Sequence, residues 1–527
     1  MHSRKHMNRN LLRALAVAAA GLTAGACQDL TVPNTNDPDR VRALAEAGDV
    51  EAVIASSWRP YWSYTQNLGD ASWAITTLSD EFSGTFANGG ALDLSSEPRT
   101  AFNNSPTYDN RFVSQGPWYS WYGGISSTNE ALQAIDRTGM KVITPVRTGG
   151  ESADNTARAR AFAKFTQGLL HGYLSLYYDQ AFITKEDKDL ADPATVAALK
   201  LAPHPEVRAA ALASLGEAAA LAEGNTFTLS NIFIQGIEMS SAEFARLIHS
   251  YTARVIAYSP RTPEDAARVD WAAVIREVDK GIRVDHSPVA DPAITAHRSE
   301  YKRKAQQNVS FSYRADYKLI GPADVSGNYQ RWLQTPVAQR TKFLITTPDR
   351  RITGATPTTS GSYFAYRTTE FFNEQRGTYH FSFYQWNRIA GAWDRGPLTT
   401  MTVAEMDLLK AEALIRLNRA AEAVPLINRT REANGKLPPV TVAGVPAGPT
   451  CVPRRDDGSC GNLMDALMYE KSIEGAGIEA FIHWWDMRRW GRLVKGTVLH
   501  FPVPGRELIT LKLPVYTTGG TNPGSAS

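Results

Sequence analysis

The sequence predicts a mainly α protein, in which a tetratricopeptide-like scaffold of paired helices supports an irregular, loop-rich lobe with short strands. Three observations predict this class. Before residue 283, long stretches carry apolar residues at three- and four-residue steps, as helices with one buried face do. Residues 284–400 are instead rich in Tyr, Phe, Thr, Gly and Pro and lack such stripes. Helical spacing returns from residue 401, so we expect the lobe to interrupt the scaffold.

The first 26 residues are expected to be an export signal. Basic residues without any acid come first, an alanine-rich apolar stretch follows, and Ala24, Gly25 and Ala26 precede Cys27. This order is typical of a cleaved signal peptide. We predict that residues 1–26 are a lipoprotein signal peptide and that Cys27 carries the lipid. The alternative is cleavage near Ala26 with Cys27 unmodified.

Removing this leader changes the charge balance. The whole chain has 56 Lys+Arg against 53 Asp+Glu, and four of the basic residues lie before Cys27, which leaves 52 against 53. The mature chain is therefore nearly neutral. A general nucleic-acid surface needs clustered basic excess, so no nucleic-acid partner is predicted.

Residues 27–45 are expected to form an extended, lipidated tether, because Pro33 and Pro38 disfavour a helix. No second long apolar run follows, so we expect contact with a membrane through the lipid anchor only. Residues 46–527 are predicted to be one domain.

Within this domain the scaffold is expected over 46–283 and 401–490, the lobe over about 284–400 and a C-terminal segment over 491–527. The predicted scaffold helices lie near 49–65, 70–82, 114–137, 154–179, 205–223, 240–257 and 264–282. The clearest is 154–179, where Ala161, Phe165 and Leu169 begin one apolar stripe.

A helical pair is predicted over 403–417 and 420–433, followed by a helix over 462–479. Pro425 falls inside the second helix of the pair, where it removes one hydrogen bond, so we expect a kink or a later start there. In the lobe, 367–373 and 378–386 are predicted to be short strands.

Two further cysteines, Cys451 and Cys460, flank a turn-rich segment containing Asp457 and Gly458. Outside the cytoplasm such a pair most simply forms a disulfide. A zinc site is disfavoured, because two thiols without neighbouring histidines do not supply four ligands.

The sequence favours a binding protein over an enzyme. It lacks the metalloprotease helix, the nucleophile elbow and the phosphate loop, and its ten histidines are scattered. We therefore predict no catalytic residue, no metal site and no cofactor. Asp80 with Glu81, or Asp456 with Asp457, could be imagined as glycosidase carboxylates, but adjacent side chains usually point apart, so a solvated or capping role is preferred.

Two loops supply candidate ligand-binding residues. Phe86 and Asn88 lie in a Gly/Asn-rich loop after a predicted helix, and Tyr329, Arg331 and Trp332 lie in the lobe. Aromatic faces stack on the C–H faces of sugars, while Asn and Arg satisfy hydroxyls. The alternative is that these aromatic residues belong to the core.

Several motifs occur in a set order along the chain. Cys27 begins a Pro/Asn-rich stretch, Trp118–Leu132 carries aromatic residues before Asn129, and Ala157–Phe162 precedes Tyr173 and Tyr177. The closing block contains Tyr469 and then the sequence from Asp486 through Arg488 and Arg489 to Trp490. In this order the motifs resemble the SusD/RagB family of outer-membrane nutrient-uptake lipoproteins.

The closing motif allows two interpretations. Asp486 could pair with Arg488 or Arg489 at a functional site, with Trp490 beside them. The preferred interpretation is structural: an ion pair with aromatic cover that fixes the C-terminal segment to the scaffold.

The family resemblance implies a non-catalytic lipoprotein, anchored in the outer membrane and facing the extracellular side. It implies that the protein binds an oligosaccharide or another nutrient and passes it to a SusC-like, TonB-dependent transporter. Two other functions stay open: a periplasmic scaffold that binds protein partners, and a lipoprotein hydrolase that uses loop carboxylates.

Overall fold

A computed structural model describes residues 44–67, 69–84, 88–144, 153–294, 297–306, 313–368, 381–388 and 393–527. The predicted signal peptide, Cys27 and nearly all of the predicted tether lie outside the described residues. The chain divides into two units, Met1–Glu46 and Ala47–Ser527, and the following description concerns the second.

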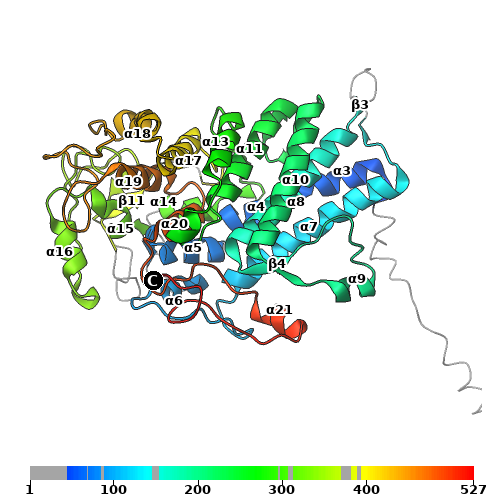
Figure 1. Ribbon diagram of the computed structural model, residues 1–527, viewed down its shortest axis with the longest axis horizontal. Helices are drawn as coiled ribbons and strands as arrows, with labels where there is room; N and C mark the ends of the chain where they lie inside the picture. The colour runs from blue at the N-terminus through cyan, green and yellow to red at the C-terminus, as the bar shows by residue number, and fades with distance from the viewer. Residues whose placement is uncertain are drawn as a thin grey trace, which may run out of the picture. The chain divides into compact units, whose positions relative to one another are not determined.

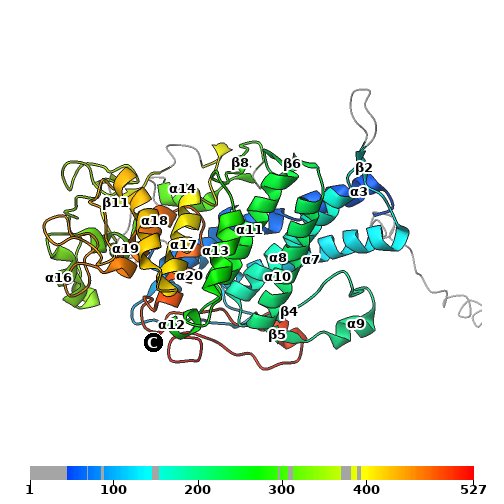
Figure 2. The same cartoon turned by 45° about the horizontal axis from the view of Figure 1, so that its top comes forward.

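A row of helices, each packed against the next, forms the scaffold (Figures 1 and 2). In order, the row consists of α7 (Phe112–Thr138), α8 (Thr156–Tyr177), α10 (His204–Gly224), α11 (Ser241–Ala257), α13 (Trp271–Lys280), α17 (Val403–Arg416) and α18 (Ala420–Ala433). Because α13 packs directly on α17, the scaffold continues across the inserted lobe. The predicted mainly α fold, with paired helices and an irregular lobe, is confirmed.

The helix α8 lies in the centre of the scaffold. The predicted stripe residues Ala161, Phe165 and Leu169 are buried, and so are nearly all later residues of the helix, since α7 and α10 cover it. At the start of α11, Ser240 and Glu243 form a capping box that satisfies main-chain N–H groups the first turn leaves unpaired.

Shorter helices surround this row. They are α3 (Ala47–Ser56), α4 (Arg59–Trp62), the π-helical turn η1 (Ser63–Asn67), α5 (Gly69–Leu78), η2 (Asn88–Gly90), α6 (Ala91–Ser95), α9 (Pro193–Ala198) and α12 (Pro263–Ala266). Of these, α3, α4 and α5 pack against α7.

Strands occur as short antiparallel pairs among the described residues. The pairs are β1 (Phe82–Gly84) with β9 (Tyr313–Ala315), β2 (Ile143–Thr144) with β3 (Ala153–Asp154), β4 (Gln180–Phe182) with β5 (Leu201–Pro203), β6 (Thr228–Ile234) with β7 (Ile237–Ser240), β8 (Val289–Ala290) with β12 (Gly396–Pro397), and β10 (Phe364–Tyr366) with β11 (Tyr384–Trp386). The pair β1–β9 joins the N-terminal region to the lobe.

The lobe also contains short helices: α14 (Glu300–Gln306), α15 (Tyr317–Ile320), η4 (Gly321–Ala323), α16 (Asn328–Gln334) and η5 (Val337–Gln339). The strand predicted over 367–373 is wrong in its described part, since Arg367 and Thr368 follow the strand β10. The buried Phe364 lies opposite the buried Trp386, and this pairing places the strand three residues earlier.

Three helices complete the chain: α19 (Leu463–Gly475), α20 (Ile482–Trp490) and α21 (Gly505–Thr510). Of the two outcomes expected at Pro425, a kink or a later helix start, the later start is wrong, because α18 begins at Ala420. Pro425 and Ala421 are both exposed, so the carbonyl of Ala421 that the proline leaves unpaired lies at a surface that water can reach.

The N-terminal and C-terminal parts of the scaffold meet in an aromatic core. The ring centroid of Tyr173 lies 5.1 Å from that of Tyr61 and 5.3 Å from that of Trp485. The hydroxyls of Tyr61 and Tyr173 donate to Glu479 over 2.6 and 2.5 Å, and Arg254 forms an ion pair with the same carboxylate at 3.0 Å. The helices that precede the lobe and those that follow it therefore share one core.

Candidate functional site

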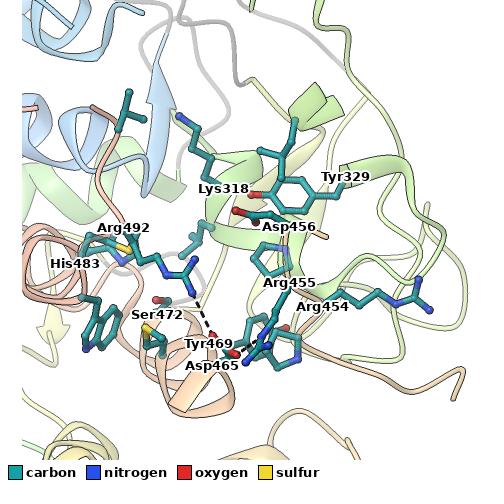
Figure 3. Close-up of a pocket in the computed structure, with 18 residues that line it drawn as sticks. Lys318, Tyr329, Arg454, Arg455, Asp456, Asp465, Tyr469, Ser472, His483 and Arg492 are labelled. Atoms are coloured by element: carbon teal, nitrogen blue, oxygen red, sulfur yellow. Dashed lines mark hydrogen bonds and ion pairs between the residues drawn. The ribbon is translucent and has the colours of Figure 1, made fainter. Parts of the chain in front are cut away.

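A pocket of about 260 Å³ lies where the lobe meets the C-terminal helices. The short helices α15 and α16 contribute one wall, residues 453–456 another, and α19, α20 and residues 492–494 the remainder (Figure 3). The volume is just below the roughly 300–1,000 Å³ of typical ligand pockets. The pocket can therefore enclose one ring-sized group.

One carboxylate organises the charges in this pocket. Asp465 lies 2.6 Å from Arg455 Nε and 3.2 Å from Arg492 Nη2, while its side chain also accepts the main-chain N–H of Asn462 in the capping box of α19. A single negative charge thus faces two guanidinium groups. The lining residues include four Lys/Arg and two Asp residues.

Lys318 has its own partners outside the pocket. Its Nζ lies 2.5 Å from Glu97 and 3.4 Å from Asp80, and Asp80 also pairs with Arg99 at 2.9 Å. The excess positive charge therefore lies at the arginines.

Three polar side chains line one side of the pocket with donors that the described protein does not use. Figure 3 shows Ser472, His483 and Arg492 together there. Neither the hydroxyl of Ser472 nor the ring of His483 hydrogen-bonds a described residue, and Arg492 uses one N–H, toward Asp465.

His483 is 7% exposed, and this burial lowers the pKa of its imidazole to about 4. At neutral pH the ring is therefore uncharged and offers one N–H donor and one acceptor.

Apolar surface completes the pocket. Tyr329, Met468, Met487 and Trp490 line it together with Leu319. The indole N–H of Trp490 donates to Glu412 over 3.1 Å, which fixes the ring. A polar edge beside an apolar wall suits a ligand with one hydroxylated or charged side and one C–H face.

Of the five predicted ligand residues, the structure describes the side chains of three, and it places them in different surroundings. Tyr329 lines the pocket, whereas Arg331 is exposed on α16 and donates to Asn328. Trp332 is buried, with the guanidinium of Arg340 4.3 Å from its ring centroid, so it packs inside the lobe.

Phe86 lies outside the described residues. Asn88 begins η2, and its side chain is likewise outside the description. Both remain predictions.

Sequence reasoning missed Ser472, His483 and Arg492. His483 and Arg492 flank the closing motif that the sequence singled out, so proximity to it was the available signal. These residues line a pocket only because the lobe packs against the C-terminal helices. Local sequence patterns do not reveal that packing.

The closing motif is buried beside the pocket. Asp486 pairs with Arg489 and, at 2.5 Å, with Lys471, while Arg489 Nε donates to Glu412 over 3.1 Å. Burial alone would raise the pKa of Glu412, but the charge of Arg489 lowers this pKa to about 2.

Arg488 does not pair with Asp486. It donates to the carbonyls of Leu176, Tyr258, Pro260 and Leu499 over 2.7–3.2 Å. It therefore satisfies carbonyls where α8 and α11 end.

Cys451 and Cys460 form a disulfide, with Cα atoms 5.6 Å apart. The loop that it closes carries Pro453, Arg454, Arg455 and Asp456 into the pocket wall. The N–H of Arg454 donates to the carbonyl of Pro322 over 2.7 Å, so the loop is also attached to the lobe.

The described residues contain no group of three or more His, Cys, Asp or Glu side chains placed to hold a metal ion. Among the described helices, none combines the length and apolar character needed to cross a bilayer.

Comparison with known proteins shows which proteins share this sequence pattern and this fold. Residues 293–517 match the sequence model of the SusD family, whereas a search of curated proteins finds no match. Among solved structures, a SusD superfamily protein from Bacteroides thetaiotaomicron is similar with a TM-score of 0.53 and 14% identity, over 88% of this chain and 96% of that one.

Two further structures are similar over nearly their whole length. A SusD superfamily protein from Parabacteroides distasonis gives a TM-score of 0.53 at 13% identity, over 90% of this chain and 99% of that one. A laminarin-binding SusD-like protein gives 0.52 at 12% identity, with the same two coverages of 90% and 99%. Residues 293–517 thus match the SusD family model, and the chain has the fold of these SusD superfamily structures, which confirms the predicted resemblance.

Proposed function

We propose that this chain is a non-catalytic, lipid-anchored protein of the outer membrane that binds oligosaccharides outside the cell and delivers them to a TonB-dependent transporter. The observation that carries the proposal is the SusD-superfamily fold, shared over 90% of this chain with a laminarin-binding SusD-like protein. The pocket supports binding of a sugar, because it combines an apolar wall with hydrogen-bonding side chains that have no partner among the described residues.

The carboxylates considered for hydrolysis support binding without catalysis. Asp80 is 2% and Glu81 1% exposed, and Asp80 is paired with Arg99, so neither reaches a substrate at the surface. Asp457 accepts hydrogen bonds from Ser459 within its own turn. A glycosidase needs two carboxyl groups facing each other across the scissile bond.

Cys27 is the proposed attachment point. A lipid there would keep the binding domain beside a membrane without a spanning segment. The periplasmic scaffold is the competing function, and the location of the binding activity separates the two.

The test compares wild-type cells with cells carrying Cys27→Ser. A panel of fluorescent oligosaccharides, with laminarin fragments included, is first titrated against purified wild-type protein and the variant. We expect both proteins to bind the same sugar with the same affinity, because Cys27 is not among the residues that line the pocket.

In cells, we expect the variant to abolish surface labelling and uptake of that sugar. Binding to none of the panel, or protection of the wild-type protein from an external protease on intact cells, would contradict the proposal.

A further inference from the structure

The pocket beside the closing motif holds more hydrogen-bond donors than the protein uses. The guanidinium of Arg492 has five N–H groups and donates one to Asp465, over 3.2 Å. The hydroxyl of Ser472 and the N–H of His483 have no acceptor among the described residues. These groups come from α19, α20 and the segment that follows, and they line the same side of the pocket (Figure 3).

His483 is the most informative of the three. Its side chain is more than nine-tenths buried, so water reaches it only through the pocket that it lines. A ligand that enters the pocket would replace water as the hydrogen-bond partner of the ring. An imidazole in this position points to a ligand that both donates and accepts hydrogen bonds.

Charge narrows the chemical class of that ligand. Arg455 and Arg492 share the single carboxylate of Asp465, so one positive charge at this site is not neutralised there. A guanidinium is planar and its paired N–H groups match the two oxygens of a carboxylate. Arg492 is 48% exposed on its side chain, so a ligand can approach the donors that Asp465 leaves unused.

Asp456 restricts where the carboxylate of a ligand can bind in the pocket. Figure 3 shows it across the pocket from Arg492, near Tyr329. It is exposed, and the described residues provide it with no ion pair. A carboxylate of the ligand therefore belongs on the Arg492 side, while Asp456 can accept hydrogen bonds from ligand hydroxyls.

We propose that this pocket recognises a uronic acid unit of an oligosaccharide, with its carboxylate held by Arg492 and Ser472, its hydroxyls by His483 and Asp456, and its C–H face against Met487 and Trp490. The proposal rests on the proposed function and names the class of sugar. A pocket of about 260 Å³ accommodates one ring of the chain, and the remainder would extend outside it.

The experiment uses the whole mature protein and pairs of trisaccharides titrated by calorimetry. The acids contain galacturonate, glucuronate or mannuronate, and each has a neutral counterpart in which the carboxyl group is reduced to a hydroxymethyl group. We expect at least one acid to bind about tenfold or more tightly than its reduced counterpart, as one charge-assisted contact predicts. Raising the ionic strength from about 0.05 to about 0.5 M should weaken binding of the acid and leave the neutral sugar unchanged.

Arg492→Gln should remove the preference for the acid and change the affinity for the reduced sugar little. The matched control is Arg419→Gln, since Arg419 is also 48% exposed on its side chain and pairs with one carboxylate, Glu422, on α18. We expect the control to bind like the wild type, and thermal melting of both variants verifies that they are folded.

Asp456→Asn provides a test of opposite sign. Removing this negative charge should raise the preference for the acid over its reduced form several-fold, because both sugars lose the same hydroxyl contact and only the acid is relieved of repulsion. Equal affinity of the wild type for each acid and its reduced form would overturn the uronate proposal and leave glycan binding intact. Binding of acidic peptides with no binding of any sugar would overturn both this proposal and the proposed function.

Discussion

Arg488 and Arg492 lie four residues apart, yet their guanidinium groups meet opposite surroundings. Arg488 is 1% exposed and its donors end on main-chain carbonyls. Arg492 is half-exposed and makes a single side-chain contact among the described residues. Because a buried charge has to be satisfied by the protein, Arg488 serves the fold, whereas Arg492 is available to a ligand.

Replacing Arg488 with Met should damage the fold. The variant leaves buried carbonyls at the ends of α8 and α11 without donors, so we expect the free energy of unfolding to fall by about 3 kcal/mol or more. Urea unfolding followed by tryptophan fluorescence measures this. Arg276→Met, at an exposed ion pair with Asp270, is the control and should change stability by less than about 1 kcal/mol. An unchanged urea midpoint for R488M would show that these contacts do not hold the helices.

At the scale of elements, the disulfide loop is the part that joins lobe and scaffold at the pocket. The carbonyl of Arg455 accepts a hydrogen bond from Gln330 of α16 over 3.0 Å, and its side chain pairs with Asp465 of α19. The loop thus fixes the distance between these two helices. Its position in the wall makes it a determinant of pocket shape.

Replacing both Cys451 and Cys460 with Ser should loosen this wall. Closing a loop of about ten residues stabilises the folded state by roughly 2–3 kcal/mol in the chain-entropy model, so we expect a loss of that size. The affinity for the pocket ligand should fall as well, because Arg455 and Asp456 are no longer held in place. Adding reductant should produce both effects in the wild type and neither in the double variant. Wild-type affinity in the double variant would exclude a role for the loop in binding.

The helices could be predicted from the sequence because their signals are local. The stripe in α8 and the alternation of apolar and charged residues in α17 depend only on residues within a few turns. Tyr329 and Trp332 were both predicted for their aromatic rings, and the structure buries both, with Tyr329 alone of the two lining the pocket. The pocket could not be predicted, because it forms where residues 318–333, 453–456 and 465–494 meet, and that contact is tertiary.

At the scale of the whole molecule, Glu81 links three distant parts of the chain. It follows α5, accepts a hydrogen bond from Tyr301 of the lobe over 3.2 Å and another from the N–H of Gly477 over 3.0 Å. It is 1% exposed, and burial raises the pKa of its carboxyl group to about 8. The folded protein therefore holds a proton there that the unfolded chain releases at lower pH.

This proton makes stability depend on pH. Between the ordinary pKa of 4.5 and about 8, the folded state binds more protons than the unfolded state at Glu81. The contribution of Glu81 to the free energy of unfolding is thus complete below the ordinary pKa of 4.5, and it is lost as the pH rises through the folded-state pKa of about 8.

Glu81→Gln should remove this dependence, so the variant should gain stability relative to the wild type as the pH rises from about 5 to about 8.5. Burial also lowers the pKa of Lys302 to about 7. Because both proteins contain Lys302, much of its contribution cancels when the free energy of unfolding of one protein is subtracted from that of the other. Thermal melting across this range is the measurement, and parallel curves would contradict the assignment.

The position of Arg488 in the chain also determines when its hydrogen bonds can form during synthesis. The carbonyls of Leu176 and Tyr258 meet their donor 312 and 230 positions later in the chain. During synthesis the N-terminal helices emerge first, and their ends stay incomplete until almost the last residues arrive. For a chain exported as proposed, these hydrogen bonds can form only after residue 488 has crossed the membrane, so the ends of α8 and α11 gain their donor after export.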